Sequence, residues 1–233
     1  MCQTTDTELA ITTRPDANFL IPQLYSTAAD WNAQPAPPLK RGEPVRSLPA
    51  TRPTPLNREV TFGVDEIIVS KTDTKGVITY ANDVFIRVCG YPEEHLIGAP
   101  HNIIRHPDFP GGVFKLLWDT ISAGQEIFAY VKNMAKDGSY YWVLAHVTPT
   151  VDRTGRIVGY HSSRRSPDRA AVAEIDTVYD LMREEEHRHH NRADAAAASL
   201  NVVAAILADK GVSYDEFVWD LIHRTSPELR GVS

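Results

Sequence analysis

The chain has 233 residues, which is enough for one domain of ordinary size with extensions or for two small domains. Its formal net charge of −6 argues against binding to nucleic acid or to an anionic membrane, because both partners require clustered Lys and Arg. Its 2 cysteines lack C-x-x-C spacing, so neither a disulfide framework nor a cysteine zinc site is expected, and the cytoplasm is the expected location. No apolar run approaches the roughly 20 residues that cross a bilayer, and no signal segment follows Met1.

The first part of the chain is rich in proline, since residues 1–58 hold nine of the 16 prolines. Each proline fixes φ and removes a backbone donor, so this part is predicted to be an extended, mostly disordered arm. A folded domain is expected over residues 59–165. A helix over 166–190 and a helical hairpin over 191–233 are expected to follow.

Strand-like runs alternate with turn residues from residue 66 onward. The predicted strands are 66–71, 76–80, 127–134, 140–151 and 157–164. Between the second and third strands, one helix begins after Asn82 and ends at Gly90, a short one starts at Pro92, and one covers 113–123. This order predicts an α+β fold, a five-stranded antiparallel sheet with helices on one face.

The C-terminal part is predicted to be helical. Ser166 is expected to cap a helix whose apolar stripe consists of Val172, Ile175, Val178, Tyr179 and Met182. An alanine-rich helix from about residue 192 and a last helix behind a capping box at Ser213 then form a hairpin suited to dimerisation or docking.

The segment from His101 to Pro110 is the least ordinary part of the sequence. It places two imidazoles, a guanidinium and a carboxylate among apolar residues and prolines, where packing alone rarely demands them. Further motifs flank it: Ile78-Thr79-Tyr80-Ala81-Asn82 upstream, and Val131-Lys132-Asn133 and Tyr141-Trp142-Val143 downstream.

From about residue 62 to 182, these motifs resemble the PAS sensor domain of the bacterial aerotaxis receptor family. The family pattern includes the R-H-P-D-x-P segment, which ordinary PAS domains lack. The resemblance implies a PAS fold that holds FAD non-covalently and signals through the oxidation state of the flavin. The membrane hairpin and signalling coiled coil of the family have no counterpart in this sequence. The expected partner is therefore a separate signalling protein of the chemoreceptor or kinase type, or a second copy bound through the C-terminal helices.

The resemblance and the side-chain chemistry together indicate candidate cofactor-binding residues. Arg105 suits the pyrophosphate of FAD, because a planar guanidinium binds phosphate oxygens in bidentate fashion, and His106 and Asp108 accompany it in the motif. Asn82 and Asn102 offer amides that match the acceptor and donor atoms of a flavin edge. Each residue also has a structural interpretation: Asn82 and Asp108 as helix caps, for example.

Aromatic candidates would cover the faces of the flavin ring. Trp118 stands where the family also carries Trp, although it could equally belong to the core. Many family members carry another Trp at the start of the next strand, where this chain has Ile127, and Phe128 or Tyr130 is the expected replacement.

Other functions were weighed against FAD binding. Haem b is the main rival cofactor, with His101 or His106 as the axial ligand. A ligand-free PAS interaction adaptor is the alternative without a cofactor. A light-oxygen-voltage photosensor is not expected, because the pocket motif has no cysteine. His187, His189 and His190 are interpreted as a solvated helix end rather than a metal site, and no catalytic motif is present, so an enzyme is not expected.

Overall fold

The computed structural model describes residues 52–225, and all of them belong to one compact unit. Most of the predicted N-terminal arm and the end of the predicted hairpin therefore lie outside the described residues. The segment just after Arg52 runs along the turn between strands β3 (Ile127–Met134) and β4 (Tyr140–Val151). There the Leu56 amide donates to the Gly138 carbonyl at 2.8 Å and the Val60 amide to the Tyr140 carbonyl at 2.7 Å. Gly138 has φ 90°, and a side chain there would meet the Thr54 carbonyl at 2.1 Å, so this turn requires glycine.

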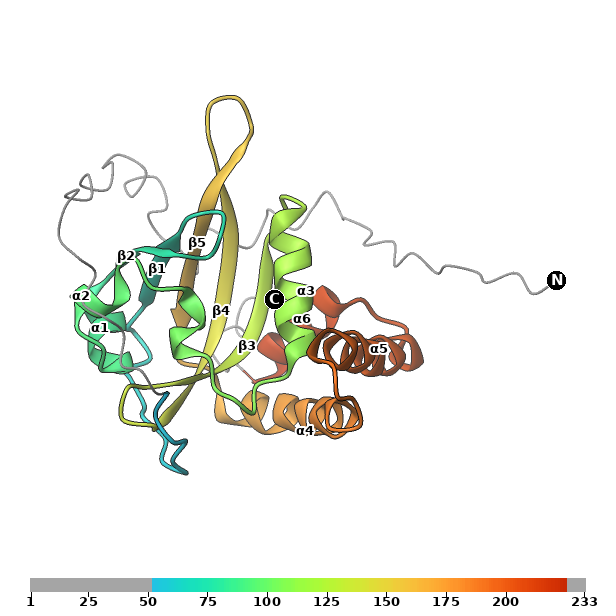
Figure 1. The fold of residues 1–233 in the computed structure, drawn as a ribbon. Coiled ribbons are helices and arrows are strands. Elements are labelled where there is room, and N and C mark those ends of the chain that lie inside the picture. Colours follow the sequence, from blue (N-terminus) through green and yellow to red (C-terminus); the bar gives the residue numbers. More distant parts are fainter. Residues whose placement is uncertain (1–51, 226–233) are drawn as a thin grey trace. The chain divides into compact units, whose positions relative to one another are not determined.

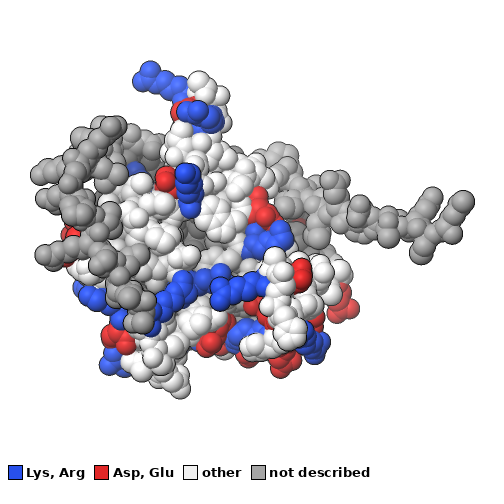
Figure 2. Space-filling model, viewed as in Figure 1, with Lys and Arg blue, Asp and Glu red and all other residues white. Residues whose placement is uncertain are grey.

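The predicted five-stranded antiparallel sheet is confirmed, with strand order β2-β1-β5-β4-β3 (Figure 1). Its strands are β1 (Ile68–Thr72), β2 (Ile78–Ala81), β3 (Ile127–Met134), β4 (Tyr140–Val151) and β5 (Ile157–Arg165). The β4–β5 hairpin projects beyond the other strands (Figure 1), and Figure 2 shows basic side chains gathered at its tip. One of them, Arg156, is paired with Asp152 at 3.3 Å.

Four helical segments follow β2: α1 (Asp83–Cys89), α2 (Glu93–Leu96), the short 3-10 helix η4 (His101–Ile104) and α3 (Gly111–Ser122). The predicted ends of α1 are confirmed, because the Asn82 side chain accepts from the Phe85 amide and Gly90 ends the helix at φ 68°. These segments cover one face of the sheet. Apolar side chains such as Ile68, Ile78, Phe85 and Leu96, all less than 1% exposed, fill the space between.

The C-terminal helices are α4 (Arg169–Glu186), α5 (Arg192–Lys210) and α6 (Tyr214–Thr225). The expectation that Ser166 caps α4 was wrong: β5 continues to Arg165, and the Asp168 carboxylate accepts from the Ala170 amide at 2.8 Å. The apolar stripe of α4 packs on the sheet face opposite α1 and α3. There the Tyr179 hydroxyl donates to the Tyr130 carbonyl at 2.7 Å.

Helices α5 and α6 pack on the same domain rather than extending away from it. Helix α6 brings Trp219 against Phe128 of β3, with ring centroids 5.0 Å apart. Helix α5 crosses α3 closely, since a side chain at Gly112 would meet the Ser199 hydroxyl at 2.4 Å. Within residues 52–225 no single helix is long and apolar enough to cross a membrane, and α5 with α6 reaches that length only as a pair bent by 70°.

Candidate ligand-binding site

The alternation of the strands separates two faces of the sheet. One face carries Ser70, Ser162 and Arg164, which the registers Ser70↔Ser162 and Ile68↔Arg164 bring close together. Tyr141 faces the same side from the start of β4, where it pairs with Asn133 of β3. We call this face the cup face, because α1, α2, η4 and α3 cover it. The four side chains are each at most 8% exposed, so polar groups are buried in an otherwise apolar core.

Arg164, His101 and Ser70 form a hydrogen-bonded group on the cup face. One terminal nitrogen of Arg164, Nη2, lies 2.7 Å from the Ser70 hydroxyl and 2.6 Å from His101 Nε2. The Ser70 hydroxyl and His101 Nε2 are themselves 3.2 Å apart. Phe85 of α1 supports the group: its ring stacks on His101 at 6.0 Å, and the Arg164 guanidinium lies 5.3 Å from the ring centroid.

The charges of this group follow from its burial. Loss of hydration lowers the pKa of Arg164 to about 10, so the guanidinium stays charged at neutral pH. Burial and the adjacent Arg164 charge lower the pKa of His101 to about 3. His101 is therefore neutral, and its Nε2 accepts a hydrogen bond from the Arg164 guanidinium.

Three buried polar atoms of the cup face have no hydrogen-bond partner among the described residues: Arg164 Nη1, the Tyr141 hydroxyl and the Ser162 hydroxyl. Buried polar groups are normally paired, so unpaired ones on one face indicate a place for a polar ligand. A guanidinium N–H and two hydroxyls suit the oxygen and nitrogen acceptors of a flavin ring. The donor set therefore fits the cofactor that the resemblance implies.

Asn82 and Asn102, the two candidate amides, lie in different environments. The Asn82 oxygen accepts from the Val69 and Phe85 amides at 2.9 and 3.0 Å, and its nitrogen donates to the Ile67 carbonyl at 2.8 Å. It thus ties the start of α1 to β1. Asn102 is exposed, and its backbone carbonyl accepts from Arg52 at 3.2 Å.

Trp118, the aromatic candidate on α3, is partly buried over the β5 end of the cup face. Its ring lies edge-on to Tyr160, with the centroids 5.5 Å apart. The Trp118 ring also approaches the turn before β2, where a side chain at Gly76 would meet it at 3.0 Å. Trp118 therefore lies on the same side of the sheet as Arg164.

The loop from Arg105 to Phe109 leaves η4 along the free edge of β3, where Arg105 makes an isolated bridge with Asn133. The Arg105 guanidinium stacks on the Phe114 ring at 4.1 Å and donates to the Phe109 carbonyl at 3.3 Å. His106 is 2% exposed, and its ring lies edge-on to Tyr140 of the opposite sheet face. Burial and the nearby Lys132 charge lower the pKa of His106.

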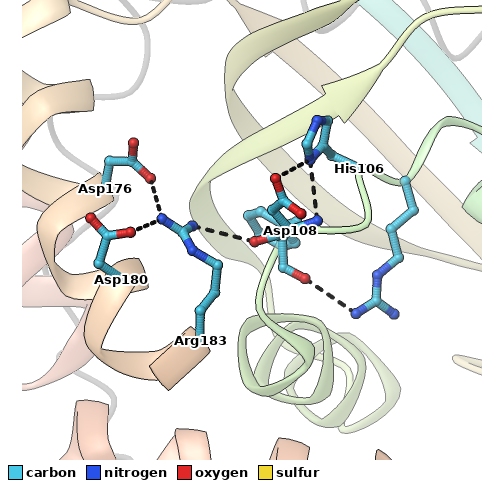
Figure 3. Close-up of polar contacts among 7 residues, drawn as sticks. His106, Asp108, Asp176, Asp180 and Arg183 are labelled. Carbon is cyan, nitrogen blue, oxygen red and sulfur yellow. Dashed lines mark hydrogen bonds and ion pairs between the residues drawn. The ribbon is translucent and has the colours of Figure 1, made fainter. Parts of the chain in front are cut away.

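Asp108 connects this loop to α4 (Figure 3). Its carboxylate is 3.7 Å from His106 Nδ1, which also accepts from the Asp108 amide at 3.2 Å. The Asp108 carbonyl accepts from Arg183 of α4 at 3.3 Å, and Asp176 and Asp180 hold the same guanidinium. Asp108 thus does not serve as the cap of α3, whose N-cap is Pro110.

Phe128 and Tyr130 do not join the other candidates. They lie at even-numbered positions of β3, and successive side chains of a strand point to opposite faces, so both face away from the cup. Phe128 stacks on His146 at 4.1 Å, and the Tyr130 carbonyl accepts from Tyr179 of α4. Phe128 and Tyr130 are therefore not among the residues of the cup face.

A separate hollow of about 460 Å³ lies between the loop Arg105–Phe109, here called the motif loop, and the junction of α4 with α5. Asp108, Arg183 and the three histidines of the α4–α5 junction are among the residues that line it. Within the described part of the chain, no group of three or more His, Cys, Asp or Glu residues could hold a metal ion. Both acidic and basic side chains line the hollow, which separates the loop from α4 and α5.

Four cup-face residues were missed by sequence reasoning: Ser70, Tyr141, Ser162 and Arg164. The sequence contained a signal for Arg164, because residues two apart on a strand share a face, and Arg164 therefore lies on the same face as Ser162 and Tyr160. A charged residue in phase with a core face is unusual. The strand pairing that identifies this face joins residues far apart in the chain, so the pattern of one strand was insufficient.

Comparison with known proteins agrees with this architecture. Residues 78–164 match the family model of the PAS fold. The aerotaxis receptor of Escherichia coli is 40% identical over 118 residues, which are 51% of this chain and 23% of that protein. The nitrogen fixation regulatory protein of Klebsiella pneumoniae is 27% identical over 139 residues, or 60% of this chain and 26% of that protein.

A solved structure, the dark state of the blue-light photoreceptor Aureochrome1 LOV, has a TM-score of 0.44 at 22% identity and covers 49% of this chain and 85% of its own. The chain spans about a quarter of the length of the two curated relatives. Its sheet and cup helices are a PAS domain. Within that class, 118 residues of the chain are similar to the aerotaxis receptor of Escherichia coli.

Proposed function

We propose that this chain is a cytoplasmic, non-catalytic PAS sensor that binds FAD and reports redox or oxygen status to a separate signalling protein. The observation that carries the proposal is a set of buried polar atoms on the cup face, from Tyr141, Ser162 and Arg164, that have no partner within residues 52–225. Its similarity to the aerotaxis receptor supports the same cofactor class.

The cofactor would be held by residues from two parts of the domain. Hydroxyl and guanidinium donors of the cup face suit the acceptor atoms of the flavin ring, and Trp118 offers an aromatic surface on the same side. Arg105 remains the candidate for the pyrophosphate. Among residues 52–225 its guanidinium donates one hydrogen bond, to the Phe109 carbonyl, so other N–H donors of its five are available for phosphate oxygens. When bound, FAD supplies a ring that accepts electrons reversibly, and the protein supplies its binding and electrostatic environment.

Haem is less well supported than flavin. His101 Nε2 already accepts from Arg164 at 2.6 Å, and a positive guanidinium beside a ligating nitrogen opposes metal binding. His106 lies against Tyr140, on the other face of the sheet. An axial histidine at either position would require these contacts to break.

The absorption spectrum of the purified protein, before and after incubation with FAD, tests the proposal. We expect the bands of a protein-bound oxidised flavin, released as FAD on denaturation. A Soret band would establish haem in place of flavin. A colourless protein that takes up neither cofactor would support the ligand-free adaptor.

A further inference from the structure

Arg164 is the only Lys, Arg, Asp or Glu within residues 52–225 whose side chain is fully buried, at 4% exposure. No carboxylate in this part of the chain forms an ion pair with it. Among these residues its hydrogen-bond partners are the neutral Ser70 hydroxyl and the neutral His101 ring, and both bind the same nitrogen, Nη2. The other terminal nitrogen, Nη1, has no partner among the described residues.

Such an arrangement is unfavourable for the domain alone. A buried charge requires a counter-charge or complete hydrogen bonding, and the described residues provide Arg164 with neither. The fold does not need Arg164 to satisfy its neighbours either, because the Ser70 hydroxyl lies 3.2 Å from His101 Nε2 and can donate to it directly. Stability of the empty domain therefore does not explain the guanidinium, whereas an electron-rich ligand does.

We propose that Arg164 is a ligand-recognition residue: Nη1 donates to an acceptor atom of the flavin ring, and the positive charge stabilises the negative charge that the ring gains on reduction. His101 and Ser70 act as positioning residues, because they hold Nη2 and so set the plane of the guanidinium. This inference rests on the proposed FAD binding. It adds Arg164 as the residue that sets the midpoint potential of the bound FAD.

The charge argument predicts a redox effect as well as a binding effect. Two electrons and one proton add one net negative charge to the flavin ring, and a buried cation beside it favours that state over the neutral oxidised state. Arg164 should therefore raise the midpoint potential of bound FAD. Removal of the charge should lower the potential, and a lysine at this position should preserve part of the effect.

The test uses the full chain, freed of cofactor and titrated with FAD by flavin fluorescence, as wild type, Arg164→Met and Arg164→Lys. Arg156→Gln removes the same charge from the exposed β4–β5 hairpin and serves as the control. We expect Arg164→Met to weaken FAD binding about tenfold to a hundredfold, as for loss of a hydrogen bond to a charged group. The melting temperature of its cofactor-free form should not fall. Titration with dithionite should give a lower midpoint potential for Arg164→Lys than for wild type, and an unchanged one for Arg156→Gln.

The outcomes separate the two proposals. A wild-type protein that does not bind FAD refutes both. If wild type binds FAD and Arg164→Met binds it equally well, with an unchanged midpoint potential, only the role of Arg164 is refuted. A cofactor-free Arg164→Met protein that melts well below wild type, yet binds FAD with the affinity and midpoint potential of wild type, would make Arg164 a structural residue.

Discussion

At the scale of single residues, His101 links protonation to folding. Burial and the charge of Arg164 lower its pKa from 6.5 to about 3, and its Nε2 must stay unprotonated to accept from Arg164. His161, whose pKa burial and Lys71 lower to about 4, adds to the effect in the same direction. In the unfolded chain both imidazoles regain ordinary pKa values, so the unfolded state binds more protons at mildly acidic pH.

The free energy of unfolding is therefore expected to be constant above about pH 7 and to fall as the pH drops through 6.5 toward the folded pKa values. Urea unfolding between about pH 7.5 and about pH 5 measures this, and His101→Gln should show a smaller fall than wild type. Glutamine can still accept a hydrogen bond from Arg164. Equal pH dependence in the two proteins would show that His101 titrates normally in the folded state.

Substitution of Arg105 tests whether its side chain serves loop packing or ligand binding. Its guanidinium stacks on Phe114 and contacts its own loop, yet it keeps donors for a phosphate. We expect Arg105→Ala to weaken FAD binding about tenfold to a hundredfold while the far-UV circular dichroism is retained. Arg87→Ala, which removes an arginine paired with Glu66 away from the loop, is the control. Full flavin occupancy in Arg105→Ala would assign this arginine to loop packing alone.

At the scale of elements, the crossing of α3 and α5 depends on the absence of a side chain at Gly112. A Cβ there would lie 2.4 Å from the Ser199 hydroxyl and 2.9 Å from the Leu200 amide nitrogen. Glu186 of α4 links the two crossing helices, because its carboxylate accepts from the Gly112 amide of α3 at 3.1 Å and from the Ser199 hydroxyl of α5 at 2.6 Å. The end of α4, the start of α3 and the middle of α5 therefore meet at one point.

Gly112→Ala should force α5 away from α3 and lower the free energy of unfolding by about 1–3 kcal/mol, as overpacking does. Gly111→Ala is the matched control, because its Cβ would meet its nearest atom, the Ala196 side chain, at 3.3 Å and needs only a small shift. Urea unfolding gives the stabilities, and hydrogen exchange of the α5 amides locates the change. Equal loss in both variants would contradict the close crossing.

At the scale of the whole domain, the motif loop provides a connection between the cup and α4. Phe109 lies edge-on to Tyr179 of α4 with centroids 5.4 Å apart, and Arg183 binds the Asp108 carbonyl (Figure 3). A ligand that engages Arg105 would act on this loop directly. We therefore propose α4 as the element through which the sensor would pass its state to a partner.

We expect hydrogen exchange over residues 166–190 to differ between the oxidised and the dithionite-reduced protein, because a charge change at the cup shifts the packing of α4. Arg183→Gln should bind FAD as wild type does but show a smaller difference, since it loses its ion pairs with Asp176 and Asp180. Identical protection in both states of the wild type, with the flavin demonstrably reduced, would exclude this route.

Local chemistry in the sequence was sufficient for most elements of the fold. Strands β3 and β4 have the predicted bounds, and α1 begins at Asn82 and ends at Gly90 as its capping residues indicate. Such capping signals act over a few neighbouring residues, so they can be read from the sequence without knowledge of the fold. The start of α4 was predicted wrongly because both Ser166 and Asp168 are good caps, and the length of β5 decides between them.

Only the tertiary structure decided which side chains share the cup. Ile68 and Arg164 become neighbours through the pairing of β1 with β5, across almost 100 residues, and no local pattern records that register. The same applies to Phe128 and Tyr130, whose chemistry suited a flavin but whose face is set by the register of β3 with β4. The sequence by itself determined the elements and the residue types available for a ligand. Strand pairing determined which of them meet, because a shift of one residue turns every side chain to the other face.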